Sequence, residues 1–425
     1  MPGPLDGLRV IDVGTRIGAP FCAGLLGEWG AEVVKVEQPR SGDFMRTIGP
    51  FADGYSLFWA VEGRGRKSAT CDLRTPEGQD LFRRLADTAD VVCENFRPGT
   101  LEDWGLGPAT LSPHLVVVRI SAFGQDGPYA ERPGLDRLGV AYGGLLHLTG
   151  EADRPPVRPG VTVADYLTGV FAAEAALAAL YRRDATPRRR GGAGREGAVG
   201  APSGPGPAAA GGAGRAPTGT GAVVDASLYG SVLRILEWTI AAYDRLGTVR
   251  SREGNRLSNS APLDNYPTSD GRFVCVVAGG DANFGRLCHA MGRPDLLSDP
   301  RYATLADRAR HGDEINGVVA SWTAARTAAE VEEACVRFDV PVATAYTAVE
   351  IAADAHFTAR HDLVTVDDPV LGAIRQQAPY PRLVGETGAT PVGAPTLGAD
   401  NVEVWCEMVG LTAGELDGLQ AQGIV

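Results

Sequence analysis

The chain has 425 residues, a hydrophobic content of 44% and a formal net charge of −12, which is enough for two or three domains with a full core. The acidic balance argues against a nucleic-acid partner, because phosphate neutralisation dominates that binding, and no run approaches the 18 apolar residues of a membrane span. Seven cysteines without CxxC spacing fit neither a disulfide framework nor a zinc site. We therefore expect a cytoplasmic globular protein with no bound metal and no permanently bound cofactor.

The basic residues are unusual in kind. Only two of the 40 are lysines, Lys35 and Lys67, and the rest are arginines. This bias is typical of codon usage, so the number of arginines is weak evidence for phosphate-binding sites.

The first 37 residues predict a strand, a helix and a second strand. An apolar run at 8–13 leads into the glycine-punctuated turn 14–20, helical spacing follows over 21–29, and Gly30 stands where a C-terminal cap belongs. Residues 31–37 read as the next strand. Such a β-α-β unit implies a parallel pair with a right-handed crossover.

The same alternation continues through residue 120. Further strands are predicted at 68–73, 90–95 and 115–120, with a helix from Thr75 to about Ala86. This rhythm indicates an α/β fold with a Rossmann-like open parallel sheet. No GxGxxG follows the first strand, so dinucleotide binding is not predicted.

The second half of the chain is less regular. A long alanine-rich helix is predicted at 165–181, and 187–220 is so rich in Gly, Ala, Pro and Arg that we expect a disordered insertion. An amphipathic helix is expected from Val223 to about Leu246. A strand at 272–277 follows the turn signal at 268–271, and a final helix is expected near 413–422.

One carboxylate is placed suggestively for chemistry. Asp165 follows Arg158-Pro159-Gly160 and lies in the first turn of the alanine-rich helix. The helix dipole and free backbone N–H groups there would favour the ionised, nucleophilic form. The alternative is structural: Asp165 caps the helix, or Thr162 caps it and Asp165 is inert. Position alone leaves both interpretations open.

Taken together, eight segments resemble the class III CoA-transferases, the family of formyl-CoA transferase and carnitine CoA-transferase. Within this family, the sequence most resembles the succinyl-CoA:glutarate CoA-transferase type. The segments, in order, are LDGLRVIDV at 5–13, GEWGAEVVKVEQPRSGDFMR at 27–46, KSATCDLRTPEG at 67–78, ENFRPGTLEDWGLG at 94–107, SAFGQDGPYAERPGLD at 121–136, GLLHLTGEADRPPVRPGVTVADYLTG at 144–169, VDASLY at 224–229 and YPTSDG at 266–271.

The resemblance implies an architecture. A large α/β domain would comprise 1–186 and a returning C-terminal segment, 341–425, with a smaller α+β domain at 221–340. Two chains would interlock as rings into a homodimer. The substrates would be an acyl-CoA and a carboxylic acid.

The resemblance also implies a mechanism and site residues. Asp165 would attack the acyl-CoA thioester, forming an aspartyl-acyl anhydride and then an aspartyl-CoA thioester that the acceptor acid resolves. Residues implied to contact coenzyme A are Arg16, Ile17, Gly18, Cys71, Asp72, Leu73, Arg74, Asn95, Phe96 and Arg97.

Two alternatives stay open. The family includes α-methylacyl-CoA racemases, but these carry a histidine where this chain has Leu135 before Asp136, and epimerisation needs two positioned acid/base groups. The chain could also be an inactive CoA-binding member. Gln38, Asp103 and Val140 depart from formyl-CoA transferase, so the formyl/oxalate substrate pair is not expected, whereas the 144–169 stretch suggests a dicarboxylate.

Overall fold

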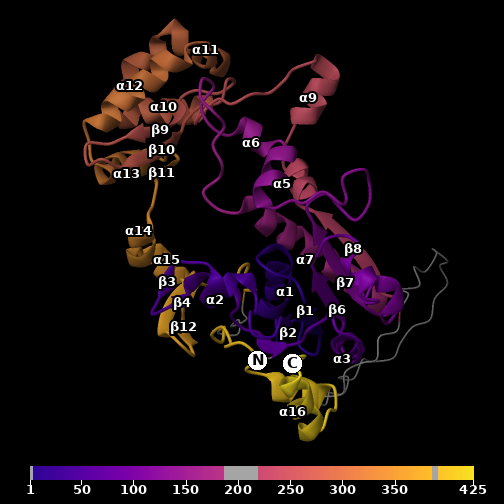
Figure 1. Ribbon diagram of the computed structural model, residues 1–425. Coiled ribbons are helices and arrows are strands. Elements are labelled where there is room, and N and C mark those ends of the chain that lie inside the picture. The colour runs from indigo at the N-terminus through magenta and orange to yellow at the C-terminus, as the bar shows by residue number, and fades with distance from the viewer. Residues whose placement is uncertain (1–2, 186–218, 385–390) are drawn as a thin grey trace, which may run out of the picture. The chain divides into compact units, whose positions relative to one another are not determined.

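The computed structural model describes residues 3–185, 219–384 and 391–425, so the insertion predicted at 187–220 lies almost wholly outside the described residues. The chain forms two compact units (Figure 1): the first takes in 1–143, 161–235 and 362–425, and the second takes in 144–160 and 236–361. The bounds predicted for the small domain, 221 and 340, do not coincide with these.

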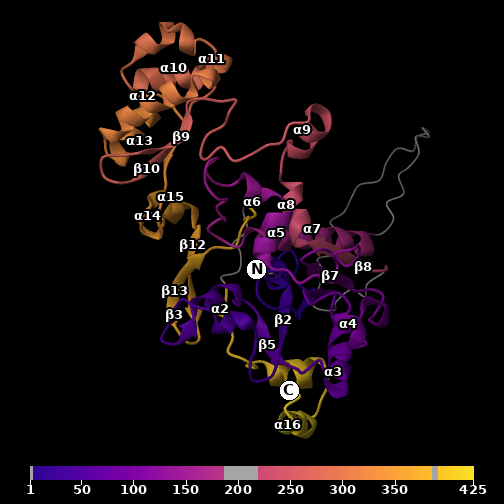
Figure 2. The same ribbon diagram turned by 45° about the horizontal axis from the view of Figure 1, so that its top comes forward.

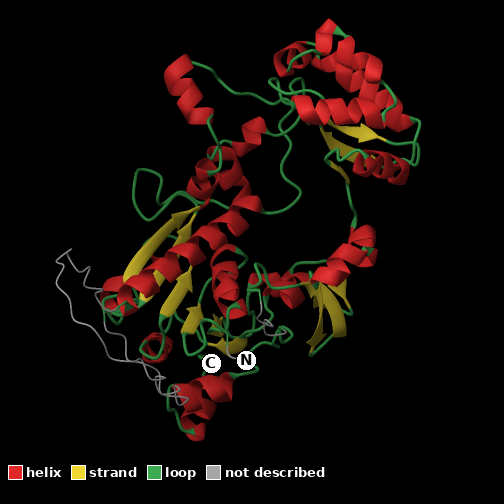
Figure 3. Ribbon diagram, turned by 180° about the vertical axis from the view of Figure 1, so that it is seen from behind, coloured by secondary structure: helices red, strands yellow, loops and turns green. Residues whose placement is uncertain are grey.

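The first unit is built on a six-stranded sheet whose order is β5-β2-β1-β6-β7-β8. Every neighbouring pair is parallel, and Figure 3 shows the strands side by side. The strands are β1 (Arg9–Asp12), β2 (Glu32–Glu37), β5 (Lys67–Thr70), β6 (Val91–Glu94), β7 (Val116–Ser121) and β8 (Ala222–Ser227). The prediction of an α/β fold with a parallel sheet is confirmed.

The edge strand β8 corrects one expectation. The predicted helix from Val223 is instead a strand to Ser227, and helices come later, as α8 (Leu228–Arg234) and α9 (Thr239–Leu246). All six residues of β8 pair in register with β7. A short segment with alternating exposure satisfies its backbone groups best against an existing strand edge, and that tertiary pairing overrides the helical pattern.

Helices cover both faces of this sheet. On one face lie α1 (Gly18–Glu28) and α7 (Val163–Asp184), which pack closely on each other (Figure 1). On the other face α3 (Pro76–Ala86), a π-helical turn (Glu403–Met408) and α16 (Ala413–Ala421) enclose a core centred on the fully buried Trp405. Within the described ranges, α7 is also the single helix long and apolar enough to cross a membrane, but nine of its residues are buried in the unit, as expected of a core helix.

The remaining elements of the first unit are short. They are 3-10 turns at Phe44–Thr47 and Pro108–Thr110, strands β3 (Phe51–Ala52), β4 (Tyr55–Ser56), β12 (Leu363–Asp368) and β13 (Gly372–Gln377), and helices α2 (Leu57–Glu62), α4 (Thr100–Asp103) and α5 (Asp136–Tyr142).

The second unit has a three-stranded antiparallel sheet in the order β11-β10-β9, with α10, α12 and α13 gathered around it (Figure 2). Its elements are α6 (Leu145–Leu148), α9, β9 (Leu263–Pro267), β10 (Phe273–Val277), α10 (Asp281–Ala290), α11 (Leu305–Arg310), α12 (Gly312–Ala324), α13 (Ala328–Arg337), β11 (Val342–Thr344), α14 (Ala348–Ala353) and α15 (Ala355–Arg360), with 3-10 turns at Pro294–Ser298 and Pro300–Tyr302. The strand predicted at 272–277 is β10.

Candidate active site

The sheet order itself points to a location for the site. If the six strands of this sheet are numbered by their order in the chain, they lie across the sheet in the order 3-2-1-4-5-6. The chain therefore proceeds in one direction across the sheet from β1 and in the opposite direction from its neighbour β6. In open parallel sheets ligands bind outside the carboxyl ends of the strands at such a switch point. The segments that leave β1 and β6 there are 13–17 and 95–97; the first overlaps the expected coenzyme A contacts at 16–18, and the second is the expected segment 95–97.

The turn after β1 is held from two sides. The Asn95 side-chain oxygen accepts the Thr15 N–H at 2.8 Å, and its amide group donates to the Thr15 carbonyl at 2.7 Å. On the other side, the Arg16 N–H donates to Asp43 Oδ1 at 3.1 Å. Arg16 has φ +67°, which is uncommon for a residue other than glycine. The turn is therefore fixed by side chains from two other loops.

Asp165 lies beside this turn. It is the third residue of α7, and a Cβ atom on Gly18 would stand 3.5 Å from Asp165 Oδ1 and 3.2 Å from Ile120 Cγ2. The absence of a side chain at Gly18 thus lets the start of α1 approach the carboxylate. Gly18 and Ala19 begin α1, and within the described residues their N–H groups have no hydrogen-bond partner, which is usual in a first helical turn.

The Asp165 carboxyl group is unusual in its ionisation. Burial raises its pKa, the nearby charge of Asp136 also raises it, and Arg16 opposes both, so that together they bring the pKa to about 7. Among the described residues, no hydrogen bond reaches the Asp165 carboxylate. Near neutral pH the group is therefore partly ionised and poorly solvated, which makes its charged form more nucleophilic.

Asp136 explains why the helix start does not favour the charged form of Asp165. Asp136 Oδ1 accepts the backbone N–H groups of Ala164 at 2.8 Å and Asp165 at 3.2 Å. The first-turn donors of α7 therefore serve Asp136. The expectation that this position favours ionisation of Asp165 is wrong, and so is the alternative of a Thr162 cap, since the Thr162 side chain makes no capping bond.

The segment after β5 differs from expectation in its side chains. Cys71 and Leu73 are 1% and 4% exposed and lie in the core, and burial raises the pKa of the Cys71 thiol to about 12. Asp72 binds Arg74, which lowers the pKa of that carboxyl to about 2. Arg74 is the exposed side chain of this segment; Asp72 and Gln38 bind its Nε and Nη2 atoms, which leaves Nη1 and the backbone for a ligand.

In the segment after β6, two side chains are engaged within the protein and one is exposed. Asn95 is engaged by Thr15, and the Phe96 ring packs edge-on against Trp104, with centroids 5.2 Å apart, beside the core. Arg97 is exposed, and within the described part of the chain its guanidinium has no ion-pair partner. Arg46, in contrast, is bound to Glu37 through two nitrogens and stacks on Trp59.

The sequence did not reveal the polar groups that build the site. Lys35, Asp43 and Asp136 lie inside segments that resemble the family, but the pattern assigns none of them a role, and Arg66 lies just outside these segments. Their signal is an ionisable residue within or just after an otherwise apolar strand, but the partners become apparent only in three dimensions. Within the described residues, no group of three or more His, Cys, Asp or Glu side chains is placed to hold a metal ion.

The fold and the sequence together define the class of protein. The sequence profile of CoA-transferase family III matches residues 5–195 and 207–401, and the chain belongs to this family. It is 41% identical to a succinyl-CoA–D-citramalate CoA-transferase of Chloroflexus aurantiacus, over 100% of this chain and 98% of that one. It is 37% identical to the β subunit of a succinyl-CoA–L-malate CoA-transferase of the same organism, over 99% and 98%.

Solved structures agree. A CAIB/BAIF family protein from Brucella suis superposes with a TM-score of 0.79 at 29% identity, over 96% of this chain and 100% of that one. The predictions of family membership and of a CoA-transferase are confirmed. The racemase and inactive alternatives receive no support, because the relatives named here are CoA-transferases.

Proposed function

We propose that the enzyme transfers coenzyme A from succinyl-CoA to a small dicarboxylic acid, with Asp165 as the nucleophile. The observation that carries the mechanism is a partly buried carboxyl of pKa about 7 at the switch point of the sheet, beside the N–H groups of Gly18 and Ala19, which have no partner among the described residues. The relatives named for D-citramalate and L-malate transfer support the donor and the acceptor class.

The first half-reaction makes the enzyme thioester. An Asp165 carboxylate oxygen attacks the succinyl carbonyl carbon, the C–S bond breaks, and a mixed anhydride and CoA thiolate form. The thiolate then attacks the aspartyl carbonyl carbon, which releases succinate and leaves an Asp165–CoA thioester. Succinate carries away one of the two oxygens of Asp165.

The second half-reaction runs the same steps in reverse. The acceptor carboxylate attacks the aspartyl thioester and expels CoA thiolate, and the thiolate attacks the acceptor side of the new anhydride. The products are the acceptor's CoA ester and Asp165, which now holds one oxygen from the acceptor.

The neighbours of Asp165 have separate tasks in this scheme. The N–H groups of Gly18 and Ala19, at the start of α1, would donate to the oxyanion that develops at each attack, and preorganised donors of this kind are worth several kcal/mol. The Arg16 guanidinium would add positive charge at the same place. Burial keeps water from hydrolysing the anhydride and the thioester.

Coenzyme A would extend from Asp165 along the edge of the sheet. We propose Arg97 and Arg74, both exposed, as contacts for its phosphates, since a guanidinium matches phosphate geometry. Residues 16–18 would face the thioester end, and 71–74 and 95–97 the nucleotide end, with Cys71, Leu73, Asn95 and Phe96 contributing backbone or packing.

An acceptor panel tests this function. The purified enzyme is incubated with succinyl-CoA and, one at a time, D-citramalate, L-malate, glutarate, acetate or formate, and CoA esters are identified by mass spectrometry. We expect transfer to dicarboxylates at rates at least ten times those for the monocarboxylates, with acetyl-CoA a poor donor. Failure of every acceptor, or a preference for formate, would contradict the proposal.

We also propose that the enzyme is a cytoplasmic homodimer with interlocked chains. Helix α9 supports a partner, because none of its residues is buried and Ile240, Tyr243 and Leu246 are 59%, 62% and 77% exposed. Apolar residues at this helical spacing normally face another surface.

Light scattering on a sizing column measures the oligomeric state. A dimer is expected for the wild-type chain, and replacing Ile240 and Leu246 by aspartate should weaken it. A monomer at micromolar concentration, or a dimer indifferent to both substitutions, would contradict the assignment of α9 to the interface.

A further inference from the structure

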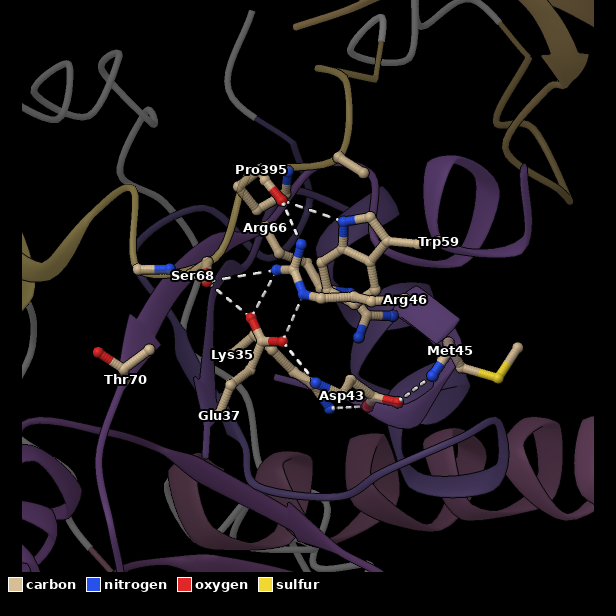
Figure 4. Close-up of polar contacts among 12 residues, drawn as sticks. Lys35, Glu37, Asp43, Met45, Arg46, Trp59, Arg66, Ser68, Thr70 and Pro395 are labelled. Atoms are coloured by element: carbon tan, nitrogen blue, oxygen red, sulfur yellow. Dashed lines mark hydrogen bonds and ion pairs between the residues drawn. The ribbon is translucent and has the colours of Figure 1, made fainter. Parts of the chain in front are cut away.

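Lys35 is one of only two lysines in the chain, and it is buried at the base of the active-site turn. Its ammonium group meets three oxygens: it donates to the Gly14 carbonyl at 2.5 Å and forms ion pairs with Asp43 Oδ2 at 2.9 Å and Asp12 Oδ2 at 3.2 Å. An ammonium group has three N–H donors, and three oxygens lie within 3.2 Å of this one. Figure 4 shows Lys35 beside Asp43.

Asp43 carries this contact onward to the turn. Its Oδ1 atom accepts the Arg16 N–H at 3.1 Å and the Thr15 hydroxyl at 3.3 Å, as well as the Met45 N–H at 2.9 Å. Lys35 therefore holds the turn twice, directly at Gly14 and through Asp43 at Thr15 and Arg16. The contact through Asp43 fixes Arg16, the residue with φ +67°. This backbone conformation persists only where the surroundings impose it.

Asp43 is itself fixed by a second layer of contacts. Its N–H donates to Glu37 Oε2 at 2.8 Å, and Glu37 is bound by both Arg46 and the Ser68 hydroxyl. Arg46 and Trp59 both donate to the Pro395 carbonyl at 3.0 Å, as Figure 4 shows. The turn beside Asp165 is thus connected to the returning C-terminal segment.

The choice of lysine at position 35 is informative because the chain uses arginine at almost every other basic position. The neighbouring Arg66 already places its guanidinium on Asp12 Oδ2 at 2.6 Å and on the Pro20 carbonyl at 2.6 Å. A second planar guanidinium has no comparable fit there, whereas a compact ammonium does. Burial would lower the pKa of Lys35, but the carboxylates of Asp12 and Asp43 outweigh it and raise that pKa, so the group stays charged.

We propose that Lys35 is a positioning residue: acting directly and through Asp43, its ammonium group holds the turn Gly14–Arg16 in the conformation that brings Gly18 and the Arg16 side chain beside Asp165. The catalytic consequence rests on the role proposed for Asp165. The effect on the turn does not, because it exists without substrate.

Amide hydrogen exchange measured without substrate tests the turn, and steady-state kinetics test the consequence. The variants are Lys35→Arg and Asp43→Asn. The second keeps Oδ1 as an acceptor but removes the negative charge opposite Lys35. Lys67→Arg is the matched control, since Lys67 is the other lysine and is also paired, with Glu32 and Glu403, away from the turn.

For Lys35→Arg we expect at least tenfold faster exchange in peptides covering 14–17 and a fall in kcat on the order of 100-fold, because a displacement of about 1 Å has that cost. KM for succinyl-CoA should change less than threefold. Lys67→Arg should alter neither exchange nor kcat. If Lys35→Arg does not fold, exchange at 14–17 and kcat are measured on Asp43→Asn and on the double variant Lys35→Met/Asp43→Asn. The double variant removes both charges.

Unchanged exchange at 14–17 in folded Lys35→Arg, or an equal effect of Lys67→Arg, would overturn the inference. Failure of all these Lys35 and Asp43 variants to fold would also overturn it, since the cluster would then support the whole unit and not this turn. Faster exchange combined with full activity of an Asp165→Ala enzyme would instead count against the proposed nucleophile and leave the positioning role standing.

Discussion

Replacing Asp165 by asparagine is expected to abolish CoA transfer, with kcat reduced at least 10⁴-fold, because the amide cannot form the anhydride that carries the acyl group. The change is isosteric, so the packing of α7 against α1 should persist. Product CoA ester is measured over hours with succinyl-CoA and the best acceptor. Deamidation is monitored in parallel by intact mass.

The same substitution should make the folded protein more stable. Burial, together with the charge of Asp136, raises the pKa of Asp165 from 3.8 to about 7 in the folded protein, so on a rise in pH the unfolded chain loses this proton first. The contribution of Asp165 to the free energy of unfolding therefore falls between about pH 4 and 7. Above pH 7 this loss of stability stays constant. Asparagine avoids this cost, and the gain at pH 8 is of the order of 2–4 kcal/mol.

Urea unfolding at pH 5 and pH 8 measures this gain, which should be larger at pH 8. Glu174→Gln is the matched control, because Glu174 is an exposed carboxylate on the same helix, and both its activity and its stability should stay near wild type. Transfer by Asp165→Asn above one part in a thousand, or lower stability than wild type at pH 8, would contradict the assignment.

Asp136→Asn is expected to shift the acid limb of kcat/KM to lower pH. Asparagine still accepts the N–H groups of Ala164 and Asp165, but the negative charge that raises the pKa of Asp165 is lost. Arg16, the remaining charge that acts on this carboxyl, lowers the pKa further. The midpoint should move down by roughly one pH unit, with kcat at pH 8 reduced less than tenfold.

Asp136→Ala separates charge from position. It removes the acceptor as well as the charge, leaves the first turn of α7 without its partner, and should lower kcat by about 100-fold at every pH. The readout is the full pH profile from 5 to 9 for both variants. A midpoint in Asp136→Asn equal to that of wild type would show that Asp136 does not set the ionisation of Asp165.

The parallel sheet was predictable because its strands are short, apolar and separated by turn residues. The strands at 8–13, 31–37, 90–95 and 115–120 reappear as β1, β2, β6 and β7 within one or two residues. These signals are local. Residues 222–227 form a strand because they pair with the edge of β7. The sequence of this segment alone does not show that such an edge is present.

The site was predictable only in part for the same reason. The position of Asp165 at a helix start follows from the sequence, but its ionisation depends on Asp136, 29 residues earlier, and on burial. Likewise Cys71 and Asn95 stand in segments expected to contact coenzyme A, yet the Cys71 side chain packs in the core and the Asn95 side chain holds the Thr15 backbone. Three-dimensional partners decide which residue of a motif faces the ligand.

The mechanism proposed for Asp165 requires this residue to exchange an oxygen atom with each acid it processes, and isotope transfer measures that exchange. The enzyme is turned over with succinyl-CoA and an acceptor whose carboxylates carry ¹⁸O, and its peptides are then sequenced by mass spectrometry. We expect ¹⁸O in the side chain of Asp165, and in no other carboxylate of the enzyme. Turnover that leaves Asp165 unlabelled would contradict it.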